Sequence, residues 1–211
     1  MNPKRQPVHR SPRFPETSDA ILRAALELGE ELGFEGLTVE AIAARSGIAK
    51  TTIYRRWPNV GAIVMDAFLA EVTRLAPIQE RATARESFTA SMRLLAKAYR
   101  GRLGKILRSL VGRAQIDLDL REAVRKRWVE PRRKIAREIV RKGIERGEFR
   151  GDLSADVVLD VLYGPLYHCM FVPYEGGTLS DTYIDALIDA VFNGLVRRSR
   201  KPQQENEGPK P

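Results

Sequence analysis

Apolar residues recur at every third or fourth position along most of the chain, which is the spacing of one face of an α-helix. Strict alternation of apolar and polar residues, the mark of a half-buried strand, is missing over any useful span. The pattern therefore predicts an all-α protein. The first helix is expected to bury Ile21, Ala25, Leu28 and Leu32, with Thr17, Ser18 or Asp19 as its N-cap and Gly33 and Gly36 after its end.

Residues 37 to 57 predict two short helices joined by a tight turn. Thr38 can cap the first helix, which should turn Ile42 inward and end near Ser46. Gly47 supplies the left-handed backbone that the turn needs, because a residue without a Cβ adopts a positive φ at little cost. Two helices joined in this way form a helix-turn-helix.

The second of these helices has an outer face of donors, hydroxyls and cations. Ile53 and Trp57 lie one turn apart and are expected to face the core. The outer face and its flanks then carry Lys50, Thr51, Thr52, Tyr54, Arg55 and Arg56. A small helix of this kind fits the major groove of DNA, where base edges are read while flanking groups hold phosphates. An ordinary helical hairpin with a solvated basic face is the alternative.

The longer pattern resembles the N-terminal domain of the TetR family of transcriptional regulators over roughly residues 16 to 70. The matching positions are Ala24, Ala25, Leu28, Gly33, Phe34, Thr38, Val39, Ile42, Ala43, Gly47, Thr52 and Tyr54, with Ile48 and Trp57 as near equivalents. The resemblance implies about nine or ten helices. It also implies that Lys50, Thr51 and Tyr54 approach base edges. The phosphate backbone would be held by Thr38, Thr52, Tyr54 and Arg56.

One departure from the family pattern concerns phosphate binding. Family members often place a lysine at the start of the fourth helix, but residues 58 to 61 read PNVG here. Arg55 or the N-terminal arm is expected to offset the loss of that contact. The arm, residues 1 to 15, carries four bases and no acid, with Arg10 and Arg13 nearest the first helix. Its four prolines predict a disordered segment that follows phosphates or enters a minor groove, a solubilising tail being the alternative.

The rest of the net charge of +9 is also uneven. Residues 121 to 150 hold twelve bases and five acids. A solvated outer face of a long helix is the expected explanation, and a second DNA surface is the alternative. A buried stripe is expected there at Val124, Trp128, Ile135 and Ile139, with Pro131 beginning or kinking a helix.

Longer helical patterns begin at about residue 83. Phe88, Met92, Leu95 and Tyr99 form a stripe, continued by Leu103, Leu107 and Leu110, and most such stripes are core. The TetR resemblance implies, however, that a small effector binds in this part of the chain. The candidate ligand-binding residues are Met92, Leu95, Tyr99, Tyr163, Tyr167 and His168. For His168 a satisfied core or pocket position is the expected one.

Residues 159 to 173 are apolar on almost all sides, so their helix must be covered on several faces. Together with a final helix over residues 183 to 196, this segment is expected to form a four-helix homodimer interface, as the last two helices of the TetR family do. The candidate contact residues are Leu166, Leu187, Val191 and Leu195.

Other functional classes find little support in the sequence. No apolar run reaches the roughly 18 residues that cross a bilayer, and residues 1 to 15 lack the core of a signal peptide, so we expect a cytoplasmic protein without a membrane partner. His168 and Cys169 are adjacent and would point about 100° apart on a helix, which disfavours a shared substrate or metal. Without a catalytic set, a zinc cluster or a phosphate loop, neither an enzyme nor a cofactor is expected.

These patterns together predict four regions. A disordered basic arm (1–15) precedes a three-helix DNA-binding domain (16–62), and a larger helical domain for effector binding and dimerisation (63–198) precedes a disordered tail (199–211). The hypothesis is a homodimeric regulator, most often a repressor in this family, that binds a palindromic operator in double-stranded DNA and is released by a small-molecule effector. A ligand-independent DNA organiser and a protein-interaction module on the same fold are the alternatives.

Overall fold

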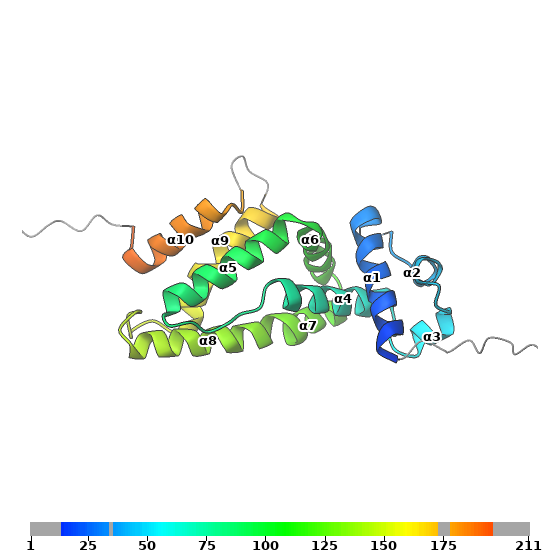
Figure 1. Cartoon of the computed structure of the whole chain (residues 1–211), viewed down its shortest axis with the longest axis horizontal. Coiled ribbons are helices and arrows are strands. Elements are labelled where there is room, and N and C mark those ends of the chain that lie inside the picture. The colour runs from blue at the N-terminus through cyan, green and yellow to red at the C-terminus, as the bar shows by residue number, and fades with distance from the viewer. Residues whose placement is uncertain (1–13, 34–35, 173–177, 196–211) are drawn as a thin grey trace, which may run out of the picture.

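Helices supply all the regular secondary structure in the residues that the computed structural model describes, namely 14–33, 36–172 and 178–195. In chain order they are α1 (Phe14–Leu32), α2 (Val39–Ser46), α3 (Lys50–Tyr54), α4 (Val60–Leu75), α5 (Ala84–Arg100), α6 (Arg102–Ala114), α7 (Leu118–Val124), the π-helix η1 (Arg125–Val129), α8 (Glu130–Glu145), α9 (Ala155–Phe171) and α10 (Asp181–Asn193). Figure 1 shows α1, α2 and α3 at one end of the molecule, with α4 leading into the larger bundle of α5 to α10. The predicted all-α fold is confirmed.

The ends of α1 differ from the sequence-based prediction. The three expected N-cap residues all lie inside the helix: Thr17, Ser18 and Asp19. An earlier start is physically reasonable because proline, here Pro15, is well tolerated in a first helical turn. Ile21, Ala25 and Leu28 are buried as predicted, but the prediction for Leu32 is wrong, since its side chain is 52% exposed. Leu32 is the last residue of α1, and Gly33 turns the chain away with φ of 71°.

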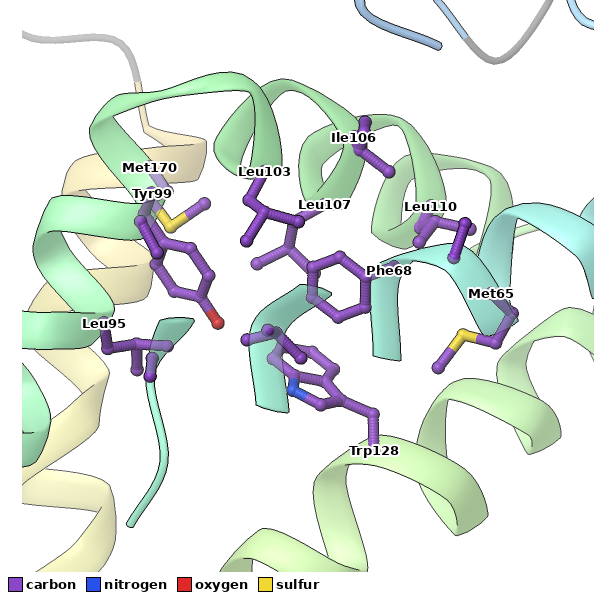
Figure 2. Packing of buried hydrophobic residues seen from close by; sticks show 14 of the residues in the cluster. Met65, Phe68, Leu95, Tyr99, Leu103, Ile106, Leu107, Leu110, Trp128 and Met170 are labelled. Carbon is purple, nitrogen blue, oxygen red and sulfur yellow. The ribbon is translucent and has the colours of Figure 1, made fainter. Parts of the chain in front are cut away.

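The larger domain is built around a continuous apolar core (Figure 2). Phe68 of α4 meets Trp128 of η1 edge to face, with ring centroids 5.2 Å apart. The stripe predicted from residue 88 onward is buried throughout: Phe88, Met92, Leu95, Tyr99, Leu103, Leu107 and Leu110. This core therefore joins α4 to the bundle by side-chain packing as well as by chain continuity.

The π-helical turn η1 explains why the predicted stripe over residues 124 to 139 is only partly buried. Trp128 and Ile139 are buried, but Ile135 is 48% exposed and Ala136 takes its place inside. A π-turn holds one more residue than an α-turn, so positions after it move along the helix face by one. The prediction that Pro131 begins a helix is confirmed, since it lies in the first turn of α8.

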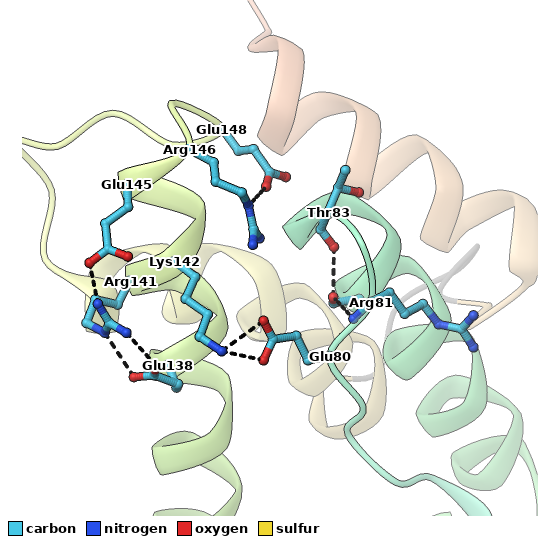
Figure 3. Close-up of polar contacts among 10 residues, drawn as sticks. Glu80, Arg81, Thr83, Glu138, Arg141, Lys142, Glu145, Arg146 and Glu148 are labelled. Atoms are coloured by element: carbon cyan, nitrogen blue, oxygen red, sulfur yellow. Dashed lines mark hydrogen bonds and ion pairs between the residues drawn. The ribbon is translucent and has the colours of Figure 1, made fainter.

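A polar cluster fixes the end of α8 against the start of α5 (Figure 3). Lys142 binds the Glu80 carboxylate at 2.7 and 3.0 Å, and Glu148 accepts a 2.7 Å bond from the backbone N–H of Ala84. Thr83 caps α5, because its hydroxyl accepts a bond from the N–H of Glu86 at 3.1 Å. These contacts satisfy donors at the first turn of α5 and hold two helices of the bundle together.

Most cations of the stretch from residue 121 to 150 have a partner within the protein. Eleven of its twelve cations make an ion pair or a hydrogen bond to a backbone carbonyl, with Lys134 as the exception in this stretch. Hydrogen bonds from Arg125 and Lys126 lower the pKa of Glu122 to about 2. The stretch is a paired surface that bridges neighbouring helices, which disfavours the alternative of a second DNA surface.

Candidate nucleic-acid interface and ligand cavity

The helix-turn-helix has the caps that the sequence predicts. The Thr38 hydroxyl accepts a 3.0 Å bond from the N–H of Ala41, and α2 ends at Ser46. Gly47 follows with φ of 72°, and its N–H bonds to the carbonyl of Ala43 at 2.9 Å. Both helix ends are therefore closed by local bonds, which fixes the angle between α2 and α3.

The reading face of α3, meaning Lys50, Thr51, Tyr54 and Arg55, points outward as predicted. All four side chains are exposed, and Tyr54 is 52% exposed. Ile53 and Trp57 face inward with exposed fractions of 0% and 7%. Thr52 and Arg56 are half-buried on the flanks, where they can contact a phosphate without entering a groove.

Two sets of ionic contacts hold the reading face in place. Arg45 of α2 binds both oxygens of Glu31 at 2.8 and 2.9 Å and reaches Glu27 at 3.5 Å, so α2 is tied to α1. Lys50 pairs with Glu40 at 3.0 Å, and this hydrogen bond lowers the pKa of the Glu40 carboxyl. Both partners of the second pair are exposed, so a DNA phosphate can compete with Glu40 for the lysine.

The remaining predicted contacts divide between described and undescribed residues. Arg56 donates a hydrogen bond to the Ser18 hydroxyl of α1, which places its guanidinium beside the start of that helix. The Thr38 oxygen accepts the capping bond of α2, so the hydroxyl proton is not used by that cap. Arg10 and Arg13 lie outside the described residues, and so do residues 199 to 211.

Thr38→Ala is expected to lower the free energy of unfolding by about 1 kcal/mol, because an N-cap bond is lost. It should also weaken DNA binding, since the α2 terminus supports the reading helix. Thr83→Ala is the matched control, as Thr83 caps α5 in the same way far from the reading face. Urea denaturation and DNA-binding titrations of both variants test this. Equal loss of DNA affinity in the two would contradict a DNA role for Thr38.

A cavity of about 290 Å³ lies inside the larger domain. Its lining residues come from η1, α8 and α9, from the helices facing them and from the segment between α4 and α5: Ile78, Leu95, Val111, Val124, Trp128, Val129, Arg132, Arg133, Ala136, Leu159, Tyr163, Tyr167 and Phe171. Three of the predicted ligand-binding residues are among them, namely Leu95, Tyr163 and Tyr167. The volume is near the lower end of small-molecule sites, which run from about 300 to 1,000 Å³.

The other three ligand-binding predictions need correction. Met92 is fully buried in the core and does not line the cavity. Tyr99 is also buried and lies behind the lining, although its hydroxyl is close enough to Tyr167 for the two to influence each other's pKa. His168 is exposed, because it occupies the outer face of α9 while Tyr163 and Tyr167 take the inner one. It is neither a core nor a cavity residue of this chain.

Sequence reasoning missed the cavity positions of Arg132 and Trp128. Arg132 was counted with the solvated cations of residues 121 to 150, yet it lines the cavity, and one of its guanidinium nitrogens is fully buried. Its spacing carried a local signal, because Arg132 lies four residues after Trp128 and shares its helix face, but its charge favoured a solvated position. Trp128 belongs to the apolar stripe predicted from the sequence. That stripe predicted that its side chain is buried, but not that it lines a cavity.

The structure also changes the assignment of the predicted dimer contacts. Leu166 is 0% exposed and packs inside the protomer, so its assignment to the interface is wrong. Leu195 is 89% exposed, but it lies beyond the end of α10, which stops at Asn193 before a glycine of positive φ. Leu187 and Val191 are half-buried against the core of their own chain. The outer face of α9 instead exposes Val157 and Val161, and Val172 is exposed directly after the helix, whereas the partly exposed Phe171 lines the cavity.

Asp66 of α4 connects the reading domain to the cavity wall. One of its carboxylate oxygens accepts a 2.8 Å bond from the indole N–H of Trp57, directly after the reading helix. The other oxygen pairs with the guanidinium of Arg127 in η1. The next two residues of η1, Trp128 and Val129, line the cavity. A single side chain thus bridges the two functional parts of the molecule.

The described ranges contain neither a cluster of metal-ligating side chains nor a membrane-spanning helix. There, no three His, Cys, Asp or Glu side chains are grouped closely enough to hold a metal ion. None of the helices in those ranges has the length and apolar character that crossing a membrane requires.

Comparisons with known proteins agree with this geometry. Residues 21–64 match the family model described as "Bacterial regulatory proteins, tetR family", and residues 78–191 match "Tetracyclin repressor-like, C-terminal domain". The HTH-type transcriptional regulator YdeS of Bacillus subtilis (strain 168) is 37% identical over 122 residues, which cover 58% of this chain and 62% of YdeS.

Solved structures give the same result over most of the chain. The TetR family transcription regulator SCO0332 superposes with a TM-score of 0.72 at 32% identity, covering 86% of this chain and 100% of its own. FadR from Bacillus subtilis, in complex with stearoyl-CoA, shares the fold with a TM-score of 0.70 at 21% identity, over 84% of this chain and 99% of its own. This chain therefore belongs to the TetR family of DNA-binding transcriptional regulators.

Proposed function

We propose that the chain is an operator-binding repressor that acts as a homodimer and is released from DNA by a small-molecule effector. The observation that carries the proposal is the bridge through Asp66, which connects the reading helix on one side to a ligand-sized cavity on the other. A DNA-binding module alone has no need of such a cavity, and a ligand carrier alone has no need of the exposed basic helix.

The reading face supports direct contact with base edges. Lys50, Thr51 and Tyr54 offer an ammonium, a hydroxyl and a phenol on an exposed surface about one helical turn long. Lysine and hydroxyl donors suit the acceptors of guanine and adenine in the major groove, and the threonine methyl suits the methyl of thymine. Thr38 and Arg56 lie at the edges of this face, where they can bind phosphates and set the register.

Dimerisation is proposed through the outer face of α9. Val157, Val161 and Val172 share that side with Gly164, and a Cβ added at Gly164 would meet no atom within 4 Å apart from the backbone of its own helix. Exposed apolar residues repeated along one helix mark a surface that another helix can cover. A two-fold dimer presents two reading helices, so the operator should be a palindrome with half-sites about one or a few helical turns apart.

Val161→Glu is expected to convert the dimer to monomers at micromolar concentration, because a carboxylate would be buried at the centre of the α9 face. Sedimentation equilibrium measures this. Ile135→Glu is the matched control: Ile135 is equally exposed, at 48% against 51%, but lies on α8. A Val161→Glu protein that remains dimeric would reject the α9 interface.

Release by the effector is proposed to act through η1. A ligand that fits the cavity contacts Trp128 and Val129, which adjoin the Asp66 partner Arg127. Movement of η1 would then change the position of Asp66 and of Trp57, and with them the angle of the reading helix. The ligand can shift this equilibrium only by binding one conformation more tightly than the other. The FadR complex with stearoyl-CoA shows that a protein of this fold can hold an amphipathic ligand.

The proposal is tested by selecting fragments from a random DNA pool with the full chain and footprinting the selected site. A discrete palindrome, protected symmetrically at physiological salt, is the expected result. Uniform protection would indicate a ligand-independent DNA organiser instead. Absence of protection even at low salt would indicate a protein-interaction module, because nonspecific contacts to phosphates are strongest there.

A further inference from the structure

We propose that the ligand of the cavity is a compact, largely apolar molecule with one anionic oxygen group, of the carboxylate type, and that Arg132 is its counter-charge. This inference rests on the effector role proposed above and specifies the chemistry of that same site. It is carried by the distribution of charge and of unpaired donors around the cavity wall.

Arg132 is the unneutralised charge of the cavity. One terminal nitrogen of its guanidinium donates to the carbonyl of Ala76 at 2.9 Å, and the other is buried without a hydrogen-bond partner. No described carboxylate lies within 4.0 Å of this guanidinium, whereas its neighbour Arg133 is paired with Asp156 at 2.6 Å and Asp160 at 2.7 Å. A buried guanidinium nitrogen without an acceptor, on a cation without an ion-pair partner, is costly, so an anion bound here would be favoured.

Further donors converge on the same place. Among the described residues, the buried side-chain nitrogen and oxygen atoms without a partner belong to Tyr99, Trp128, Arg132 and Tyr163. Three of these four residues line the cavity. The hydroxyl of Tyr99 lies near that of Tyr167, and the hydroxyl of Tyr163 near that of Ser91, so the indole N–H of Trp128 and the buried Arg132 nitrogen are the donors that lack an acceptor. Buried polar atoms are nearly always paired in folded proteins, so two such donors at one cavity indicate a missing acceptor. Indole and guanidinium groups only donate, which excludes a purely donating ligand head.

The tyrosines remain neutral donors. Burial raises the pKa of Tyr99 and Tyr163, and it raises that of Tyr167 to about 12. The charge of Arg132 acts in the opposite direction on all three, which places the three hydroxyls within the field of one guanidinium. At neutral pH the wall therefore offers O–H donors beside a positive charge, an arrangement that suits a carboxylate oxygen.

The rest of the cavity determines the body of the ligand. Leucine, valine, isoleucine, alanine and phenylalanine side chains form most of the remaining wall, so the body should be apolar. The volume of about 290 Å³ favours a compact molecule. A single unpaired cation favours a single negative charge, because a second one would enter an apolar space without compensation.

The experiment compares three probes that share an eight-carbon chain: octanoate, octan-1-ol and octylammonium. Calorimetric titration of the full chain at neutral pH should give octanoate an affinity at least about tenfold higher than that of octan-1-ol. Octylammonium should have the lowest affinity of the three. The factor follows from the usual strength of a hydrogen bond to a charged group. Arg132→Met should remove the preference for octanoate while octan-1-ol still binds, which would show that the cavity persists. Lys134→Met is the control, because Lys134 lies two residues after Arg132 on α8, is exposed and carries the same charge.

Each outcome decides the proposal. Equal or tighter binding of octan-1-ol or octylammonium by the unaltered chain overturns it, and so does a tenfold octanoate preference that survives Arg132→Met. If Arg132→Met fails to fold, the comparison of the three probes on the unaltered chain and on Lys134→Met still decides. Failure of all three probes to bind at millimolar concentration overturns both this inference and the effector role of the cavity. A protected palindrome would leave the DNA-binding function standing in every case.

Discussion

Tyr54→Ala is expected to reduce operator affinity by about 1 to 3 kcal/mol per half-site, and Lys50→Ala by a similar amount. Both side chains are exposed on the reading face, and neither supports the core, which is held by Ile53 and Trp57. A homodimer loses the contact twice, so each substitution should weaken binding by at least about thirtyfold. Fluorescence anisotropy with the selected operator at fixed salt measures the change.

Two matched variants separate the roles of these side chains. Tyr54→Phe keeps the ring and removes the hydroxyl, so it shows whether Tyr54 acts by hydrogen bonding or by apolar contact. Glu40→Gln removes the acid that pairs with Lys50 at 3.0 Å, and it should raise affinity several-fold because the lysine is released and a repulsive charge is lost. Unchanged affinity in both alanine variants, with dimerisation intact, would show that the reading face is assigned wrongly.

The helix-turn-helix was predictable in detail because local interactions determine it. The Thr38 cap and the Gly47 turn each depend on bonds within four residues, and the inward position of Ile53 follows from helical spacing alone. The reading face then consists of the α3 side chains that remain exposed to solvent. Sequence and structure agree here because few distant contacts can override such local signals.

The cavity and the dimer surface were less predictable because they depend on packing between distant segments. Leu166 and Val161 are both apolar residues of α9, and which of them is buried depends on where α5, α6 and α8 lie. His168 was misplaced for the same reason. Ile135 was misplaced because the π-turn at η1 shifts the helix register. The helical repeat of 3.6 residues shows neither the packing between distant segments nor a π-turn.

Asp66→Ala is expected to disconnect the reading domain from the cavity. It leaves the indole N–H of Trp57 and the guanidinium of Arg127 without their shared acceptor, so the free energy of unfolding should fall by about 1 to 3 kcal/mol. Chemical denaturation measures this loss. Arg93→Ala is the control, because it breaks an exposed ion pair with Asp185 on the far side of the bundle and should cost less than about 1 kcal/mol.

The functional consequence is a loss of ligand response. In the unaltered chain, a cavity ligand such as octanoate should lower operator affinity, and by linkage the operator should lower octanoate affinity by the same factor. Asp66→Asn retains an acceptor for Trp57 but not the charge that holds Arg127, so it isolates the contact to η1. If Asp66 carries the coupling, that factor should approach one in Asp66→Asn and in Arg127→Met, while each ligand still binds alone. A factor that stays at its original value in both variants would exclude this route and point to the Phe68–Trp128 contact, which links α4 to η1 through the core.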